Sequence, residues 1–495
     1  MKIGLISVYF GLFDDALPVT FRQERNELNQ KIEEGLSHYG DVINPGLIDN
    51  EENAMTANKL YKKEKVQALV YSPTMAAPPI YLKKSIENLD LPILCVSPQE
   101  FRSTPKNYNT DLGTEHSTLV GLTMGTNILV REGIEFNVYI LHVDDIPFST
   151  EIKEFFKENK VIKQVTDIEK KESSINFSLS QLNNSKAIKA IDKLKNYPLI
   201  TFGEPISGYL DVEMTKKDEE LIGVNIKKIT KKELNDTFNN INELDVKNNI
   251  KELNDKFTKA RTIKKETLER SSRLNLTLNN IVEKNNAIGG AINCHGDFFR
   301  WNNNIGITGC LSVSCLAEKG SLFSCTGDVP TSIALVASKI ISGSALYCEC
   351  YTIDFENDTI LIANGGEGDF TINNTSPNLR ILPEDHYMGE RGPGVAVQFD
   401  IEEMEATLIS ISPTLINNKN EWRIILAEGV TSKSAHQDME GPNTMFKFKT
   451  KTAKKGFEEW ALLGATHHAV LMPGHHKKEF EIFSNEMNIN LKVIY

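Results

Sequence analysis

Two adjacent histidines near the C-terminus, His467 and His468, are the residues whose types and spacing best indicate chemistry. They follow the strand-like apolar run Trp460 to Leu463 and precede Lys477 to Asn490, where apolar residues recur at roughly helical spacing. An imidazole in such a turn can project into a cleft and bind a divalent metal as a neutral ligand. The alternative is a polar turn with one solvated histidine.

Three acidic residues stand out in the C-terminal half of the chain. They are Glu349 in the run Tyr347 to Thr352, Glu367 in the glycine-rich turn Gly365 to Gly368, and Asp328. The glycine-rich turn lacks the Lys-Ser/Thr pair that follows a phosphate-binding loop, so we interpret it as a turn. Asp328 has a structural alternative, because its side chain can cap the helix expected from Val329 to Ile341.

Length, composition and charge limit the classes of function. The chain has 495 residues, 40% hydrophobic and 25% charged, which is ordinary for a globular protein. This length exceeds what one core usually holds, so we expect two or three domains. The net charge of −12 and the pI near 5.5 argue against nucleic acid and acidic membranes as partners.

Cysteine usage and the absence of long apolar runs indicate a compartment. The seven cysteines are odd in number, and six of them lie in apolar or motif contexts: Cys294, Cys310, Cys315, Cys325, Cys348 and Cys350. We therefore interpret the cysteines as reduced thiols that mostly pack in the core. The N-terminal run Ile3 to Val8 is too short for a signal peptide, and no run approaches the length of a membrane helix. We therefore expect a cytoplasmic protein.

The first third of the chain alternates between strand and helix patterns. Buried-strand candidates are Ile3 to Val8, Val66 to Tyr71 and Leu91 to Val96, and Phe21 to Tyr39 is an amphipathic helix candidate. This alternation predicts a parallel, doubly wound sheet with helices on both faces. Ligands bind beyond the carboxyl ends of such strands, so the two segments that follow the first strands are crevice candidates: Val8 to Gly11 and Ser72 to Met75. No Gly-x-Gly-x-x-Gly follows the first strand, which disfavours a dinucleotide site.

The remainder predicts two further α/β and β-rich parts. The stretch from Lys247 to Asn285 is helical in pattern, with one buried face and a solvated charged face. Runs such as Thr359 to Ile362 and Ala406 to Ile411 predict a largely antiparallel C-terminal domain. The predicted domains are residues 1–196 (Rossmann-like α/β), 197–340 (central α/β) and 341–495 (β-rich, with part of the active site).

The order of motifs along most of the chain resembles that of the L-arabinose isomerase and L-fucose isomerase superfamily. Members end with a glycine-rich turn into a paired histidine, then a helix and a last strand, as Leu463 to His468 and Ile489 to Ile494 do here. Further similar pieces are Gly309 to Ser312, Cys325 to Val329, the run around Glu349, and Arg391 to Gly394. The resemblance identifies the chain as a divergent member.

What this resemblance implies is aldose–ketose isomerisation of a sugar, through an enediol or enediolate, in a cleft between the central and C-terminal domains. A divalent metal, expected to be Mn²⁺, holds adjacent sugar oxygens while two carboxylates move protons. In this chain Glu349 matches a metal-binding glutamate that also acts as base, and His468 matches the last metal-binding histidine. Asp328 is a second catalytic candidate, and Glu367 is a third candidate metal ligand.

The resemblance also implies substrate-side residues and an assembly. The loop that holds His295 and Asp297 matches a substrate-side loop of the family, although His295 could equally cap a turn and Asp297 start a helix. His116 matches a histidine that reaches a neighbouring subunit's site, and its alternative is a surface residue at a helix start. We therefore expect a homo-oligomer, a trimer or hexamer.

Two positions depart from the family pattern. Thr326 stands where the family has its first metal-binding glutamate, and a threonine hydroxyl is neither charged nor a base at neutral pH. Asn364 or Gly365 stands where a metal-binding histidine is expected. These departures favour two alternatives to an aldose–ketose isomerase: a paralogue that binds carbohydrate or regulates without turnover, and a related lyase or epimerase.

Overall fold

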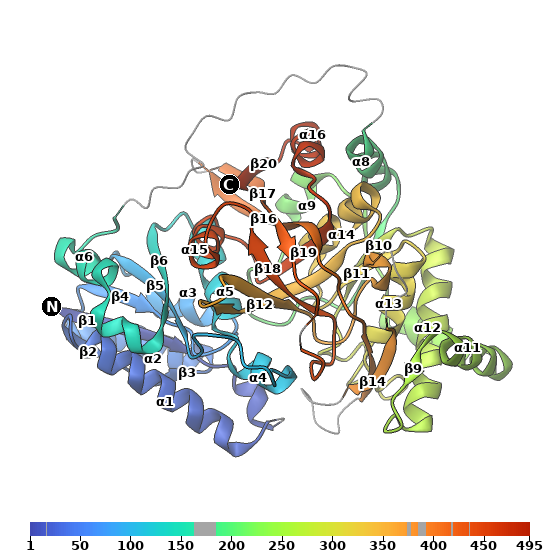
Figure 1. The fold of residues 1–495 in the computed structure, drawn as a ribbon, viewed down its shortest axis with the longest axis horizontal. Helices are drawn as coiled ribbons and strands as arrows, with labels where there is room; N and C mark the ends of the chain where they lie inside the picture. Colours follow the sequence, from blue (N-terminus) through green and yellow to red (C-terminus); the bar gives the residue numbers. More distant parts are fainter. Residues whose placement is uncertain (16, 163–184, 374–377, 385–392, 417–418, 435) are drawn as a thin grey trace.

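The computed structural model describes residues 1–495 except 16, 163–184, 374–377, 385–392, 417–418 and 435. Within this part of the chain three main sheets follow one another, and Figure 1 shows them side by side with the C-terminal sheet in the middle. The described helices include none that is long and apolar enough to cross a membrane.

The N-terminal sheet is parallel, with the strand order β2-β1-β4-β5-β6 and β3 paired to β1. Its strands are β1 (Lys2–Val8), β2 (Asp41–Ile43), β3 (Leu47–Ile48), β4 (Ala68–Tyr71), β5 (Ile93–Gln99) and β6 (Phe136–His142). The helices of this part are α1 (Val19–Leu36), α2 (Glu51–Glu64), α3 (Ile80–Ile86), α4 (Thr110–Glu115), α5 (Thr118–Arg131) and α6 (Thr150–Glu158).

Helices cover both faces of this sheet because its strands are apolar on both sides. Leu28 and Ile32 of α1 pack with Leu5 on one face, whereas Tyr61 of α2 packs with Ile6 on the other. The predicted strands, the predicted helix and the parallel arrangement are all confirmed here.

The second sheet is also parallel, in the order β11-β10-β7-β8. Its strands are β7 (Leu199–Phe202), β8 (Ile226–Lys228), β10 (Gly289–Ile292) and β11 (Leu322–Ser324). The helices around it are α8 (Lys186–Asn196), α9 (Lys216–Ile222), α10 (Lys231–Asn239), α11 (Glu243–Lys256), α12 (Lys265–Asn285), α13 (Cys310–Glu318) and α14 (Val329–Ser342).

The stretch from Lys247 to Asn285 was predicted as one helical segment, and this prediction was wrong at its centre. The chain leaves α11 at Phe257, whose extended backbone caps the helix, and forms the short strand β9 (Thr258–Lys259) before α12 begins. Strand β9 pairs with β14 (Arg380–Glu384), which pairs with β15 (Gly394–Gln398). The pairing of β9 with a distant strand thus overrides the helical pattern.

The C-terminal sheet is antiparallel except for one parallel edge pair, β17 with β20, which confirms the prediction of a largely antiparallel part. In the order β16-β19-β12-β13-β18-β17-β20 its strands are β16 (Met404–Ile416), β19 (His468–Pro473), β12 (Leu346–Asp354), β13 (Thr359–Ala363), β18 (Asn443–Phe448), β17 (Lys419–Thr431) and β20 (Asn490–Ile494). Helices α15 (Ala453–Leu462) and α16 (Lys477–Met487) flank it.

The segment before the paired histidines was predicted to be strand-like, and this was wrong. Trp460 to Leu462 belong to α15, whose apolar residues are buried on one side. The strand comes after the turn instead, because His468 is the first residue of β19. Helix α16 follows, as predicted.

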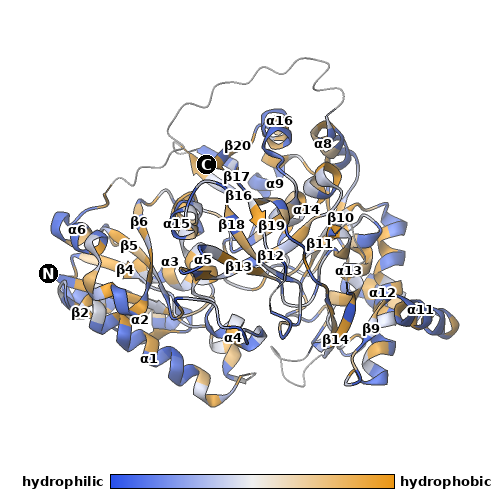
Figure 2. Cartoon of the chain, viewed as in Figure 1, coloured by the Kyte–Doolittle hydropathy of each residue, from blue (hydrophilic) through white to orange (hydrophobic). Residues whose placement is uncertain are grey.

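One apolar cluster links distant parts of the chain. It contains Leu69 of the first sheet, Leu268 of α12 and Leu346 of the C-terminal sheet, and Figure 2 shows the apolar strands inside the polar helix surfaces. Each of the ranges 1–196, 197–340 and 341–495 contains one main sheet, but the β9–β14 pairing crosses the boundary at 340. The division into three domains stays a prediction.

Candidate active site

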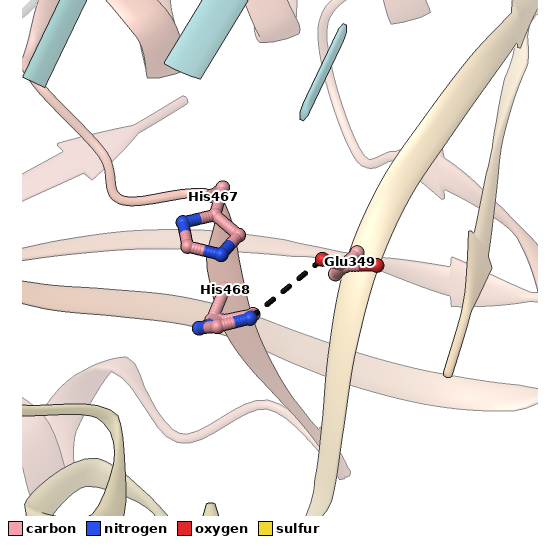
Figure 3. A group of neighbouring side chains, drawn as sticks. All are labelled: Glu349, His467 and His468. Atoms are coloured by element: carbon pink, nitrogen blue, oxygen red, sulfur yellow. Dashed lines mark ion pairs between the residues drawn. The ribbon is translucent and has the colours of Figure 1, made fainter. Parts of the chain in front are cut away.

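Strand pairing brings Glu349 and His468 together. In the antiparallel pair β12–β19 these two residues lie directly opposite each other, and opposite residues of such a pair place their side chains in contact. His468 Nε2 lies 3.6 Å from Glu349 Oε1, as Figure 3 shows. The predicted convergence of these two residues, more than a hundred positions apart in the sequence, is present in the structure.

The two oxygens of Glu349 have different surroundings. Tyr351 Oη donates a hydrogen bond of 2.6 Å to Oε2, while Oε1 faces His468. Tyr351 also lies on β12, two residues further on, where the pairing with β13 shifts register, and its hydroxyl still reaches Glu349. The tyrosine therefore fixes the orientation of the carboxylate and leaves one oxygen for a ligand.

A buried carboxylate orients His468. Asp328 Oδ2 lies 2.7 Å from His468 Nδ1, and Asp328 Oδ1 accepts a hydrogen bond from the backbone N–H of Thr331 and so caps α14. Burial, reinforced by the neighbouring His467, holds the pKa of His468 well below its usual value. A neutral imidazole with its Nδ1 side anchored presents Nε2 for a metal.

Asp328 thus confirms the predicted helix cap, but it lies behind His468 rather than at the cavity. Both of its oxygens are engaged, and its side chain is fully buried. Burial raises its pKa to about 6. The geometry makes Asp328 a positioning residue, whereas the sequence suggested a catalytic one.

His467 completes the cluster, although of the two histidines the sequence had indicated only His468 as a metal ligand. Its Nδ1 pairs with Asp211 Oδ2, and its ring lies against that of His468 at 3.6 Å between centroids. Burial alone would lower the pKa of His467, but Asp211 outweighs burial and the pKa lies above its usual value. Asp211 carried no sequence signal, because it stands 256 positions from His467.

Glu349, His467 and His468 form a group whose potential ligand atoms lie within 4.8 Å of one another. One carboxylate and two imidazoles suit a borderline divalent ion such as Mn²⁺ or Zn²⁺. Each imidazole is backed by a carboxylate, an arrangement that accompanies histidine ligands in metalloproteins. These three residues therefore fit a divalent metal.

Glu367 lies on the same cavity but outside this group of three, which corrects its assignment as a direct ligand. It follows β13 in a turn and is buried. Burial, together with the nearby Glu384, raises its pKa to about 7. A carboxyl group that exchanges its proton near neutral pH suits acid–base chemistry better than metal binding.

Glu384, at the end of β14, is a further cavity residue that the sequence did not indicate. It accepts hydrogen bonds from Thr308 Oγ1 at 2.9 Å and from Arg300 Nη2 at 3.4 Å. Gly366 approaches it closely: with φ of +142°, an added Cβ would meet Glu384 Cδ at 3.1 Å. Only glycine fits that backbone without strain.

The opposite wall of the cavity comes from the N-terminal sheet and is largely apolar. Phe10 follows β1 and Met75 follows β4, so both lie beyond the carboxyl ends of parallel strands, and both line the cavity. The two crevice candidates named from the sequence therefore border the cavity. The other apolar lining residues of this wall are Leu12, Phe13, Ala76, Val120 and Met124, and Ile206 from the second part of the chain packs beside them.

The two departures from the family pattern also face this cavity. Thr326 lines it with φ of +54°, a left-handed conformation that is rare for a β-branched residue, and its hydroxyl donates to its neighbour's carbonyl at Cys325. Asn364 lines it too, and its side-chain amide donates to Tyr347 O. Neither supplies the carboxylate or imidazole that the resemblance leads one to expect.

The other two predicted substrate-side residues lie in different places relative to the cavity. His295 lines the cavity, where burial and the nearby Arg300 lower its pKa to about 3. Asp297, by contrast, is exposed and pairs with Lys231 at 2.7 Å, so it is not at the site. The reason is that the turn carrying both residues directs only the first inward.

His116 lies beside the cavity, between the lining residues Thr114 and Ser117. Its Nδ1 pairs with Glu100 of its own chain at 2.7 Å. Its role toward a neighbouring subunit stays a prediction. The motif Arg391 to Gly394 falls partly on residues 385–392, outside the described part of the chain.

Comparisons with known proteins bear on the C-terminal part. Residues 344–490 match the family model of the L-arabinose isomerase C-terminal domain. No curated protein matches the chain. Among solved structures, a leucine binding protein, LivK, from Thermotoga maritima MSB8 is 11% identical over 70% of this chain and 69% of that one, with a TM-score of 0.22, and so low a score carries no argument. The matched range contains Glu349, Glu367, His467 and His468, and over residues 344–490 the chain is L-arabinose isomerase-like.

Proposed function

We propose that the protein is a metal-dependent aldose–ketose isomerase, an intramolecular oxidoreductase that acts on an open-chain sugar. The observation that carries this proposal is the Glu349–His467–His468 group, which lies within the range that matches the L-arabinose isomerase C-terminal domain. The same cavity holds a second titratable carboxyl group, Glu367. A cation site and two carboxyl groups on one cavity are what this chemistry requires.

Glu349, His467 and His468 hold the divalent ion in this proposal. When bound, an ion such as Mn²⁺ supplies positive charge that stabilises negative charge developing on two adjacent sugar oxygens. Asp211 and Asp328 keep both imidazoles oriented from behind. Any proton that His467 carries must leave before its imidazole can bind the ion. Binding of the ion therefore releases more protons at lower pH, where more of His467 is protonated.

The two carboxyl groups divide the proton transfers. The conversion of an aldose to a ketose moves one hydrogen from C2 to C1 and another from O2 to O1. Glu349, held by Tyr351, takes the proton from C2 and returns it to C1. Glu367, with its pKa near 7, gives a proton to O1 and receives the one from O2.

The apolar wall of Phe10, Met75 and their neighbours keeps bulk water from the reacting carbons. This function belongs to a soluble cytoplasmic homo-oligomer in our proposal. The ligand is then a small-molecule sugar, with neither nucleic acid nor membrane as partner.

The test combines metal analysis with a proton-exchange assay. Purified protein is loaded with Mn²⁺, its metal content is measured, and a panel of aldoses is incubated in D₂O while NMR follows ketose formation and deuterium at C1 or C2. We expect turnover in the parent and at least a 100-fold loss in Glu349→Gln. Glu356→Gln, an exposed carboxylate of the same C-terminal part, is the matched control. Turnover that survives Glu349→Gln would contradict the assignment of the base.

A second function is favoured by Thr326 and Asn364, which replace an expected carboxylate and imidazole at the cavity. In this case the protein binds carbohydrate or regulates without turnover, or it catalyses a related lyase or epimerase reaction. Calorimetry that detects sugar binding in a protein with no deuterium exchange would support the binding paralogue. Exchange at C2 with no ketose would support an epimerase, and loss of carbon–oxygen or carbon–carbon bonds would support a lyase.

A further inference from the structure

The guanidinium of Arg300 is buried at the cavity with most of its hydrogen-bonding capacity unused. The residue is 5% exposed and lines the cavity that holds Glu349 and His468. Among the described residues its Nε and Nη1 atoms have no hydrogen-bond partner. These two nitrogens carry three of the five N–H donors of an arginine. Buried donors are nearly always satisfied in folded proteins, so this group points to a missing acceptor.

Among the described residues Arg300 has one acidic partner, which does not satisfy it. Glu384 Oε1 approaches Nη2 at 3.4 Å, which is long for a charge-assisted hydrogen bond. Glu384 is also engaged by Thr308, whose hydroxyl donates to Oε2 at 2.9 Å. Each edge of the guanidinium therefore keeps a free N–H for a second acceptor.

Another buried arginine of this chain has both of its terminal nitrogens paired, although its Nε has no partner among the described residues. Arg25, 1% exposed, binds Glu100 through Nη1 at 2.7 Å and Glu115 through Nη2 at 3.0 Å. Two carboxylates thus serve one buried guanidinium in the N-terminal part. Arg300 has one carboxylate at a longer distance, and the residue also lines the cavity.

The surroundings of Arg300 select the kind of acceptor. It is the one lysine or arginine among the described residues that line the cavity. His295 beside it has a pKa lowered to about 3 and adds no charge at neutral pH. Planar or tetrahedral oxyanions bind the arginine fork through paired hydrogen bonds, which a single sugar hydroxyl cannot match.

We propose that Arg300 binds an oxyanion of the substrate, and that the cavity therefore takes an acidic sugar, one that carries a carboxylate or a phosphate group. This rests on the proposed function in that the ligand is a sugar. It adds the chemical class of that sugar and a residue that determines specificity. The acidic group lies at Arg300, while the carbonyl end lies at Glu349 and the two histidines.

The experiment compares matched ligands on the Mn²⁺-loaded protein by calorimetry. Each set contains a neutral hexose, the hexuronic acid of the same stereochemistry and the hexose 6-phosphate, and inorganic phosphate alone is a fourth ligand. We expect the uronate or the phosphate ester to bind at least about tenfold more tightly than the neutral sugar, since one charge-assisted contact contributes that much. The arm that binds tighter identifies carboxylate or phosphate as the source of the oxyanion.

Variants link the preference to Arg300. In Arg300→Met the affinity ratio of acidic to neutral sugar should fall close to one, and in Arg300→Lys to an intermediate value, because lysine keeps the charge but not the fork. Arg102→Met, an exposed arginine paired with Asp145, should keep the parent's ratio. If the Arg300 variants do not fold, Glu384→Gln decides: removal of the competing carboxylate should increase the affinity for the acidic sugar.

Several results would overturn the inference. They are a neutral sugar that binds as tightly as its acidic counterparts, a preference that survives Arg300→Met, and inorganic phosphate that binds as tightly as the acidic sugar. Isomerisation assays in D₂O test the proposed isomerase activity separately from the role of Arg300 in binding. Acidic sugars that bind through Arg300 without being isomerised would refute the proposed isomerase activity and support the preference of Arg300 for acidic sugars. Neutral sugars that are isomerised while acidic sugars do not bind would support the isomerase activity and refute the role of Arg300.

Discussion

At the scale of single residues, the burial of Glu367 has a consequence for stability. Its pKa rises from 4.5 to about 7 on folding, so the folded protein holds this proton more tightly than the unfolded chain. Stability from this group is fully present below about pH 4.5 and is lost as the pH rises through 7. The loss amounts to on the order of 3 to 4 kcal/mol, at about 1.4 kcal/mol per pKa unit.

We therefore predict that Glu367→Gln, which is neutral at every pH, removes this loss. Without added metal, the variant should unfold at a higher temperature than the parent at pH 8 and at nearly the same temperature at pH 4.5. Thermal unfolding followed by circular dichroism at both values measures the difference. Parallel pH profiles for the two proteins would show that Glu367 does not titrate in this range.

Thr326 supports a prediction about metal affinity. It faces the cavity of Glu349, His467 and His468 but supplies no charge. Thr326→Glu should increase Mn²⁺ affinity by at least about tenfold, the range of a single contact around a metal, because a carboxylate replaces a neutral hydroxyl beside the ion. Calorimetric titration of both proteins provides the measurement. Equal or weaker binding by the variant would mean that another residue already fills this position.

At the scale of elements, helix α14 and strand β19 meet at Asp328, which serves both. Its Oδ1 caps the helix and its Oδ2 orients His468. Asp328→Ala should cost about 1 kcal/mol of stability through the lost cap and should weaken Mn²⁺ binding. Asp328→Asn keeps a capping oxygen, so stability should fall less while metal affinity still falls by roughly tenfold.

Thr452→Ala is the matched control for this prediction, because it removes the N-cap of α15 far from the ion-binding group. It should reduce the unfolding temperature and leave the metal titration unchanged. Metal affinity that is equal in the parent and in both Asp328 variants would show that the helix cap is the whole role of this aspartate.

Only some of the helices and strands could be predicted from the sequence. The first sheet was predictable because its strands and helices have uninterrupted periodicity, as Ile3 to Val8 shows. The local pattern gave the wrong secondary structure where a distant strand determines it. Strand β9 interrupts a helical stretch because it pairs with β14, over a hundred residues away. The strand prediction for the run that begins at Trp460 was wrong for a local reason, since a short apolar run fits a buried helix as well as a strand.

The site divides in the same way. Glu349 and His468 were found because each lies in a local motif, and their contact follows from strand register. Asp211, Glu384 and Arg300 were missed because their importance comes only from what folds against them. Sequence identifies groups that carry chemistry, whereas the residues that orient and charge those groups require the fold.

At the scale of the whole molecule, the candidate site draws on the entire chain. Its lining runs from Phe10 after the first strand to His468 in the last sheet. Binding of Mn²⁺ or sugar should therefore stabilise the parent as one unit, by about 2.7 kcal/mol at a ligand concentration a hundred times Kd. His116 lies close to this cavity, between two of its lining residues, and pairs with Glu100.

The assembly supplies the last prediction. The sequence resemblance suggested that His116 reaches the adjacent subunit, and on that basis we propose that each site is built from two chains in a closed ring, a trimer or hexamer, in which one surface patch meets a different one. Light scattering should report a multiple of the 55.5 kDa chain. Mixed oligomers of His116→Ala and Glu349→Gln subunits give the sharper test, because an interface that joins an intact His116 to an intact Glu349 restores one working site. Activity that recovers on mixing supports a shared site, whereas stable hybrids of an active parent that stay inactive would place each complete site within a single chain.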